Sequence, residues 1–177
     1  MMITLYREES LILLLDPQRA LLVFHLAGQL AAVPLENVER IAPMTQLARP
    51  IGMPAPLEGV LNLAGTAVPV VRLDRLLQLP APPPGLYSML IILKGVSSGR
   101  AALLVDRVIE ILSVPVSALV PVQDEDSFNA CAEATVSMRG EIVHLLSPTR
   151  ILLEKERETL SEFQARAQRR LRDWASE

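Results

Sequence analysis

Apolar residues along this chain fall into short runs that alternate with polar positions and end at glycine or proline. In the first regular run, Leu22, Phe24 and Leu26 share one face, which is the two-residue period of a strand. Turn residues separate the runs, as between the two strands of a hairpin. The pattern indicates a mainly β fold, with strands expected over residues 20–26, 30–35, 87–93, 101–105, 131–138 and 141–146.

The stretch Gly59–Leu77 has the strongest local signal. A glycine turn leads into a β-branched run that carries no charge before Arg72, which predicts a buried strand. Pro69 lacks a backbone donor, so we expect this strand at a sheet edge or at a bulge. Residues 72–77 then predict a short helical turn with its charges outward and its leucines inward.

Two pairs of segments indicate an internal repeat. Leu63–Val71 aligns with Met138–Leu146, with matching glycine and apolar positions. Ala31–Val38 aligns with Ala101–Val108, and the separation along the chain is nearly the same as in the first pair. Two independent alignments with nearly equal separations predict two copies of one small β module.

The copies flank a proline-rich segment, which we interpret as a stiff linker and a subdomain boundary. Each copy holds several short strands, which favours a small barrel over a parallel sheet, and two barrels would leave an apolar groove for an amphipathic helix. The expected division is a leader over 1–19, a first barrel over 20–79, the linker over 80–86, a second barrel over 87–153 and a C-terminal helix over 154–177.

The C-terminal segment predicts an amphipathic helix. Its early half is rich in glutamate and its late half in arginine, an order that suits the helix dipole. Two roles stay open for its apolar stripe: packing on its own barrel, or contact with a partner or a second copy, with Phe163, Leu171 and Trp174 as anchors. The stripe consists of Leu153, Leu160, Phe163, Ala167, Leu171 and Trp174.

Composition narrows the class of partner and the compartment. A net charge of −3 argues against a nucleic-acid partner, which needs a clustered cationic surface. The longest uncharged run, Ala20–Leu35, is too short and interrupted to span a membrane, and the N-terminus lacks a signal-peptide pattern. A single cysteine, Cys131, gives no disulfide framework. We therefore expect a cytoplasmic protein.

The sequence offers no recognisable catalytic or metal site. His25 and His144 fall in predicted strands without a cysteine or carboxylate at a ligand or triad spacing, so a structural role is expected for both. Cys131 is interpreted as a small core residue, and Asp106 and Glu110 as solvated or turn-forming carboxylates. No glycine loop for phosphate is present. We expect no enzymatic activity and no cofactor.

The chain resembles the CheW-like chemotaxis coupling proteins over roughly residues 22–153. The motif that carries the resemblance is G-V-L-N-L-x-G over Gly59–Gly65, followed by Val68–Val71. A second part is L-V-D-R-V over Leu104–Val108, and the last is Val143–Leu146. The first two motifs are quite specific as a pair.

The resemblance implies two intertwined five-stranded SH3-like barrels without catalytic activity. It implies binding to the regulatory domain of a CheA-type histidine kinase and to the helical hairpin tip of a chemoreceptor. On the matching positions, Val38, Gly59, Gly65 and Val108 would lie at or near partner surfaces.

The chain departs from the family pattern at two of these places. Ala64 stands where typical members have arginine, and Arg40, before Ile41, stands where they often have glutamate. Both changes remove charge-assisted contacts that fix the choice of partner, which puts the usual receptor contact in question. The full set of expected partner-binding residues is Val38, Arg40, Ile41, Gly59, Ala64, Gly65 and Val108.

The sequence therefore predicts an adaptor that couples a chemoreceptor-type sensor to a CheA-type kinase. One alternative is a scaffold in another signalling complex, such as those of pilus motility or development. A second is a small-molecule-binding double barrel with a sensor role, which the scarcity of aromatic residues disfavours. A third is a regulatory fragment of a kinase, which the lack of an ATP-binding motif disfavours.

Overall fold

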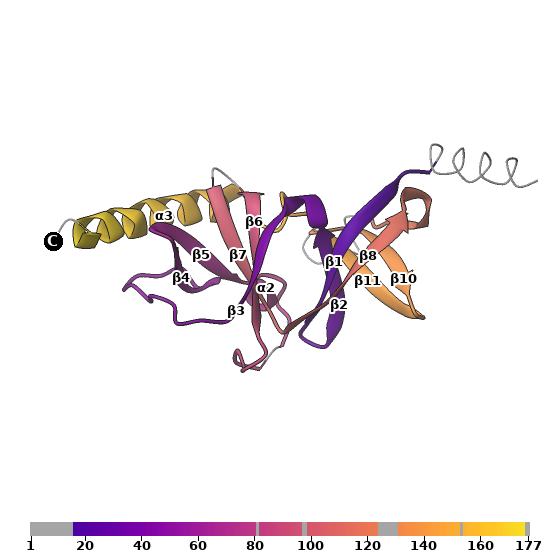
Figure 1. The fold of residues 1–177 in the computed structure, drawn as a ribbon, viewed down its shortest axis with the longest axis horizontal. Helices are drawn as coiled ribbons and strands as arrows, with labels where there is room; N and C mark the ends of the chain where they lie inside the picture. The colour runs from indigo at the N-terminus through magenta and orange to yellow at the C-terminus, as the bar shows by residue number, and fades with distance from the viewer. Residues whose placement is uncertain (1–15, 81, 97–98, 124–130, 153, 176–177) are drawn as a thin grey trace, which may run out of the picture.

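The computed structural model describes residues 16–80, 82–96, 99–123, 131–152 and 154–175. Two sheets lie side by side, and a long helix extends from one of them (Figure 1). The six-stranded sheet has the order β8 (Arg107–Pro115), β1 (Gln18–Leu26), β2 (Gln29–Pro34), β11 (Glu141–Leu146), β10 (Ala132–Met138) and β9 (Val120–Pro121). The five-stranded sheet has the order β3 (Val38–Pro43), β6 (Met89–Val96), β7 (Gly99–Val105), β5 (Thr66–Arg72) and β4 (Leu57–Leu63).

Three short helical elements and the long helix α3 complete the described chain. They are η1 (Leu35–Asn37), α2 (Leu73–Leu76), η2 (Val116–Ala118) and α3 (Glu154–Ala175). The mainly β fold with a C-terminal helix is thus confirmed. Most of the expected leader, residues 1–15, lies outside the described residues, and β1 begins at Gln18.

The two sheets are built in the same way, which confirms the internal repeat. Strands β8, β1, β2, β11 and β10 correspond in order to β3, β6, β7, β5 and β4. One parallel pair joins the copies in each sheet: Val70 lies opposite Ala102, and Leu145 lies opposite Ala32. In the sequence alignment of the copies, Val70 matches Leu145 and Ala32 matches Ala102. The repeat therefore extends to the register of individual residues.

Each sheet takes strands from both copies. The six-stranded sheet joins β1 and β2 of the first copy to β8–β11 of the second, and the five-stranded sheet joins β3–β5 to β6 and β7. The expected boundary at 80–86 falls between α2, which contacts β7, and β6, which pairs with β7 in the five-stranded sheet. The proline-rich segment thus separates the two copies in the sequence. It does not separate the two sheets, because each sheet contains strands from both copies. The inner faces of both sheets share one apolar cluster, so neither copy has a complete core alone.

Neither sheet closes into a barrel within the described residues, which corrects the barrel expectation. The outer strands are β8 and β9 in one sheet, and β3 and β4 in the other. The connection between β3 and β4 forms a single isolated β-bridge, in which Ala48 pairs with Val60 of β4. Pro50, Pro54 and Pro56 lie in that connection and have no N–H to donate to a ladder, so it does not form a further strand.

Three hairpins turn on an X-Gly pair in which both residues have positive φ. The angles are 49° and 79° at Ala27-Gly28, 50° and 84° at Ala64-Gly65, and 52° and 85° at Arg139-Gly140. Positive φ at both central residues is the type I′ turn, whose twist matches the twist of paired strands. The expected hairpins at the first and last of these pairs are confirmed.

Pro69 lies in an internal strand, so the expected edge position was wrong. Strand β5 pairs with β4 along Leu57–Leu63 on one side and with β7 on the other. The β7 ladder, however, begins only at Val70. Pro69 therefore sits just before the point at which the second ladder requires a donor.

A buried ion-pair network joins β4, β5 and α2. Arg72 Nε and Nη2 donate to Asp74 Oδ1 and Oδ2 at 2.8 and 2.6 Å, and Arg72 Nη1 donates to Glu58 Oε2 at 3.2 Å. Arg72 and Asp74 are 7% and 5% exposed, so the expectation that the charges here point outward holds only for Arg75. Burial by itself would raise the pKa of Asp74, but Arg72 outweighs it and the pKa is lowered.

The position of Glu58 follows from a bulge. The register of β4 against β5 shifts between Leu57 and Gly59, which leaves Glu58 as the extra residue. A bulge re-aims the side chain of its extra residue, and here the carboxylate turns toward Arg72 and Arg49. The second copy has the same shift around Glu133, whose carboxylate lies 2.8 Å from Arg19.

We expect Gly59→Ala to destabilise the fold. A Cβ at this position would lie 2.7 Å from the Leu47 Cβ and 2.8 Å from the Ala48 carbonyl oxygen, which would push away the bridging segment. The cost should be about 1–3 kcal/mol of unfolding free energy, measured by denaturant titration. Gly85→Ala is the control because a Cβ there meets nothing within 4 Å. Equal stability of the two variants would contradict the packing.

We expect Asp74→Ala to cost about 2–4 kcal/mol of unfolding free energy near neutral pH. The change leaves the buried Arg72 guanidinium with one carboxylate, at 3.2 Å. Because the pKa of Asp74 is lowered in the fold, its contribution is present above its ordinary value of 3.8 and is lost as the pH falls through the folded pKa. The difference in unfolding free energy between the wild type and the variant should therefore shrink in acid. Asp173→Ala, at an exposed position, should change stability by no more than about 0.5 kcal/mol.

Candidate protein-binding surfaces

The β3 edge carries three of the expected partner-binding residues. Val38 is half-buried and packs against the apolar cluster shared by the sheets, so its role is partly structural. Arg40 is exposed, and Ile41 is 37% exposed. The residue between Val38 and Arg40 is Glu39, the extra residue of a bulge, and its carboxylate lies 2.6 Å from the Nε of Arg100.

The β8 edge of the other sheet has the same design. Val108 lies opposite Phe24 as Val38 lies opposite Leu93, and both valines pack against the shared cluster. Ile111, the counterpart of Ile41, is 58% exposed. The two sheets therefore each end in an outer strand that presents an isoleucine to solvent.

The two edges differ in charge. Arg40 corresponds to Glu110 when the alignment of Val38 with Val108 is continued along both strands. The Glu110 Oε1 lies 3.0 Å from the Nη2 of Arg139, so the second edge is tied to the tip of the β10–β11 hairpin. Equivalent backbone positions with opposite charges would select different partners.

The β4–β5 hairpin holds the other expected residues, in different environments. Gly59 is buried under the segment that contains Leu47, so it supports the hairpin and does not face solvent. Ala64 and Gly65 form the turn itself. Gly65 N donates to Asn62 Oδ1 at 2.8 Å, which fixes the turn from within.

Helix α3 contacts this hairpin directly. The Gln168 Nε2 donates to the Gly65 carbonyl at 2.9 Å, and the Ala67 N–H donates to the Gln168 Oε1 at 2.8 Å. The Gln164 Nε2 donates to the Ala67 carbonyl at 3.0 Å. These bonds occupy backbone groups of Gly65 in the turn and of Ala67 in the part of β5 that has no β7 partner. Sequence reasoning predicted a helix here but not these two glutamines as its points of attachment.

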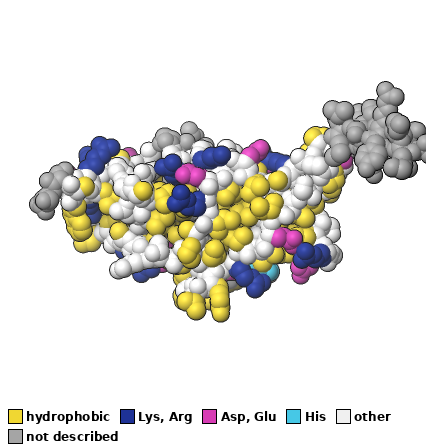
Figure 2. All heavy atoms as spheres, viewed as in Figure 1, with side chains coloured by type: hydrophobic (Ala, Val, Ile, Leu, Met, Phe, Trp, Pro, Cys, Tyr) yellow, Lys and Arg dark blue, Asp and Glu magenta, His cyan; other side chains and the backbone are white. Residues whose placement is uncertain are grey.

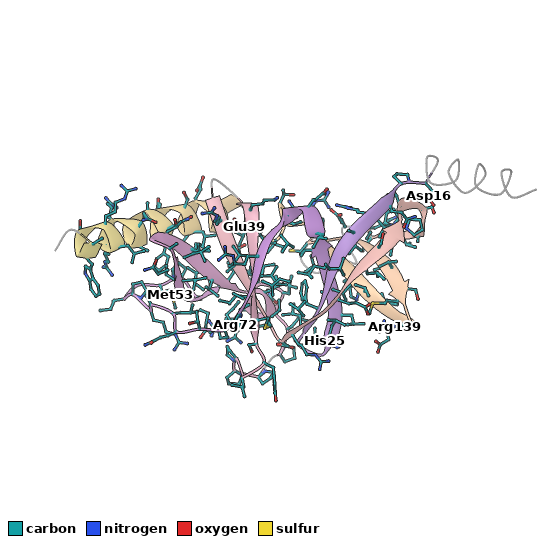
Figure 3. All side chains as sticks on the ribbon, viewed as in Figure 1. Asp16, His25, Glu39, Met53, Arg72 and Arg139 are labelled. Atoms are coloured by element: carbon teal, nitrogen blue, oxygen red, sulfur yellow. The ribbon has the colours of Figure 1, made fainter. Side chains whose placement is uncertain are left out.

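The expected partner-binding residues do not form one patch. Strands β3 and β4 are opposite edges of the five-stranded sheet, and Val108 belongs to the other sheet. In Figure 3, Glu39 on β3 lies apart from Arg139 at the far hairpin, with Arg72 in the middle of the molecule. Figure 2 shows apolar side chains gathered over the region where β1 and β2 are labelled in Figure 1, with few charges among them. The expected partner-binding residues therefore lie on several separate surfaces.

The three expected anchors of α3 also separate. Phe163 is 7% exposed and packs in the core of its own chain, and Leu171 is half-buried against the same cluster. Trp174 is 83% exposed. The apolar stripe thus packs on its own sheet over most of its length, while its last member faces solvent.

The residues considered for catalysis have structural partners. The Asp106 Oδ2 accepts the Ala27 N–H at 2.7 Å, which ties β8 to the first hairpin turn, and Glu110 pairs with an arginine. Burial raises the pKa of the Cys131 thiol and lowers the pKa of His144. In the described part of the chain, no group of three or more histidine, cysteine, aspartate or glutamate side chains could hold a metal ion.

The proline-rich segment lines an open hollow that sequence reasoning did not anticipate. The hollow measures about 780 Å³, and its walls include Arg72, Arg75, Pro80 and Pro84. The loop that follows protrudes at the lower edge of Figure 1, and its Leu86 is 90% exposed. The only sequence signal for this hollow was a charged residue, Glu58, next to Gly59. Its inward orientation depends on a β-bulge, which the sequence does not reveal.

Comparison with known proteins agrees with this architecture. No match was found among curated proteins. One similar solved structure is the scaffolding protein TtCheW from Thermoanaerobacter tengcongensis, with a TM-score of 0.67 and 21% identity over 73% of this chain and 84% of that chain. None of the helices that the structure describes is long and apolar enough to cross a membrane. Residues 20–156, well over half of the chain, match the family model described as CheW-like domain. The chain therefore belongs to the CheW-like domain family.

Proposed function

We propose that this chain is a non-catalytic adaptor that couples a chemoreceptor-type sensor to a CheA-type histidine kinase. The observation that carries the proposal is the CheW-like domain over residues 20–156. The resemblance implies that members of this family bridge those two partners. The same domain would also serve a scaffold in a related signalling complex, so the pathway is part of what the experiments test.

Two edges of equivalent design support a bridging role. Ile41 on β3 and Ile111 on β8 present exposed apolar side chains on outer strands, where backbone groups are open to pairing. The edges lie on different sheets, so two partners can bind without competing for one surface. The charge difference between Arg40 and Glu110 gives each edge its own preference. The mechanism is geometric: the adaptor holds its partners at a fixed separation.

The β4–β5 hairpin supports a receptor contact that differs from the family pattern. Ala64 sits at its tip in a left-handed conformation, and it replaces the guanidinium that typical members carry. Arg139 occupies the equivalent turn position in the other copy, with φ of 52° against 50° at Ala64. The turn therefore accepts arginine, and the loss of that side chain changes contacts with a partner rather than the backbone.

A small-molecule sensor is the second candidate, and one observation favours it. The hollow beside the proline-rich segment is large enough for a ligand. Its charged walls, however, already satisfy one another through Arg72, Asp74 and Glu58. A shift in melting temperature with a metabolite library, lost in Arg75→Ala, would support this candidate.

We expect the purified protein to bind the regulatory domain of a CheA-type kinase encoded beside it, without any cofactor. Ile41→Glu and Ile111→Glu each place a charge on an apolar edge, and the one that lies in the kinase interface should weaken binding about tenfold or more. Isothermal titration calorimetry measures the affinities. Ile51→Glu is the control, because Ile51 is fully exposed on a loop. No binding by the wild type would contradict the adaptor role.

We expect Ala64→Arg to bind a chemoreceptor hairpin fragment about tenfold more tightly than the wild type, because it restores a charge-assisted contact. Its melting temperature should stay close to that of the wild type, since Arg139 adopts the same backbone conformation. Binding is followed by surface plasmon resonance, with Ala64→Gln as the uncharged control. Equal affinities for all three proteins would show that the partner itself differs from an ordinary chemoreceptor.

A further inference from the structure

A groove lies between the C-terminal half of α3 and strand β4, and the adaptor role does not use it. Its volume is about 290 Å³. Val60 comes from the floor of the sheet, Pro50 from the connection between β3 and β4, and Leu171 and Trp174 from the helix. We name this surface the α3–β4 groove. The C-terminal half of α3, which lines the groove, projects at one end of the molecule (Figure 1).

The α3–β4 groove is apolar at its base and ends in the only tryptophan of the chain. Ala167 and Leu171 lie four residues apart on α3, and Trp174 follows one turn later on the same face. Ala167 is buried and Leu171 is half-buried against the shared cluster, whereas Trp174 is 83% exposed. An exposed tryptophan that lines an apolar groove is well suited to anchor a partner, because tryptophan is enriched among the residues that carry binding energy.

The charges around the groove are mostly positive. The last half of α3 carries four exposed arginines against a single aspartate, although the whole chain has a net charge of −3. Arg170 lines the groove on the helix side and Arg49 on the opposite side. The other charged residues of this half are Arg166, Arg169, Arg172 and Asp173. A cationic rim around an apolar base complements a partner that is acidic and amphipathic.

We propose that the α3–β4 groove binds an acidic amphipathic helix of a partner protein. The volume accommodates a few apolar side chains and lies just below the range of cofactor pockets, so side chains of a helix fit it better than a whole ligand. Apolar residues of the partner helix contact Leu171 and Trp174, and its carboxylates face Arg170 and the exposed side of Arg49, which also pairs with Glu58. This is the helix-in-groove mode of recognition.

Two other occupants fit less well. An anionic membrane would also attract a tryptophan beside arginines, but membrane binding uses a convex apolar face. Here the apolar side chains converge into a concave surface, and the exposed Glu158 and Glu162 on the same helix would be repelled. A second copy of the chain could offer its own acidic half of α3, but the exposed residues described there, Glu158, Thr159, Ser161 and Glu162, are polar and would not fill the apolar base of the groove.

Fluorescence of Trp174 tests the proposal in the full chain, because no other tryptophan contributes. The probes are four synthetic helical peptides of about five turns, with glutamate on one face and leucine and phenylalanine at different helical spacings on the other. Lysine-for-glutamate versions and sequence-scrambled versions are the peptide controls. Vesicles with phosphatidylserine and a dilution series of the protein alone test the membrane and the second copy.

We expect at least one acidic peptide to bind with a blue shift of Trp174 emission and with an affinity that falls as salt rises. Arg166→Glu/Arg170→Glu should weaken binding about tenfold or more. Arg107→Glu, an exposed arginine on β8, should bind as the wild type does. Trp174→Ala, followed by anisotropy of a labelled peptide, should also bind weakly, and circular dichroism checks that each variant is folded.

Several outcomes would overturn the proposal. One is that none of the four acidic peptides binds at concentrations up to about 1 mM. Another is that lysine or scrambled peptides bind equally well. A shift of Trp174 emission with vesicles and not with peptides would assign the surface to a membrane. A shift of this emission with protein concentration alone would assign the surface to a second copy.

Discussion

The fold depends on two parallel strand pairs that join the copies, β2 with β11 and β5 with β7. Each pair links strands from opposite sides of the proline-rich segment, so neither sheet forms without both copies. The inner faces then bury one shared apolar cluster. Parallel pairing between distant segments forms slowly, because the chain between them must close into a loop first. Because each sheet takes strands from both copies and the sheets share one apolar cluster, the two copies form one structural unit, as the proposed adaptor role requires.

The shared cluster also accounts for the character of the surfaces. Val38 and Val108 contribute to it from β3 and β8, so the edges are rigidly attached to the core. Each edge exposes an isoleucine at the equivalent position, Ile41 on β3 and Ile111 on β8. The charged residues beside them, Arg40 and Glu110, have opposite signs. The duplication thus supplies two equivalent edges, and substitution at single positions gives them different preferences. The proposed bridging role would use this combination of one shared core and two unlike surfaces.

Sequence reasoning could predict the elements that depend on local or periodic signals. The hairpins follow from X-Gly pairs, and the repeat follows from apolar positions that keep their register from one copy to the next. The exchange of strands between copies was implied by the family resemblance to intertwined barrels, but the apolar pattern could not predict it, because both copies present the same pattern and either could supply a neighbour. The buried network was missed for another reason. A one-residue bulge turns Glu58 inward, and period-two alternation assigns such a residue to the wrong face.

The symmetry between the copies breaks at α3. In the six-stranded sheet the parallel ladder includes Val143 opposite Leu30, but the equivalent pair is absent from the five-stranded sheet, whose ladder starts at Val70. Gln164 and Gln168 satisfy the backbone groups that this leaves open. The counterpart of the covered Ala67 is Ile142, which is 62% exposed. The helix therefore distinguishes two hairpins of equal geometry: one is tied to α3 through Gly65, and the other points its arginine at the β8 edge. Any partner that binds the β4–β5 hairpin must also contact α3 or displace it. A partner that binds the β10–β11 hairpin meets no such constraint.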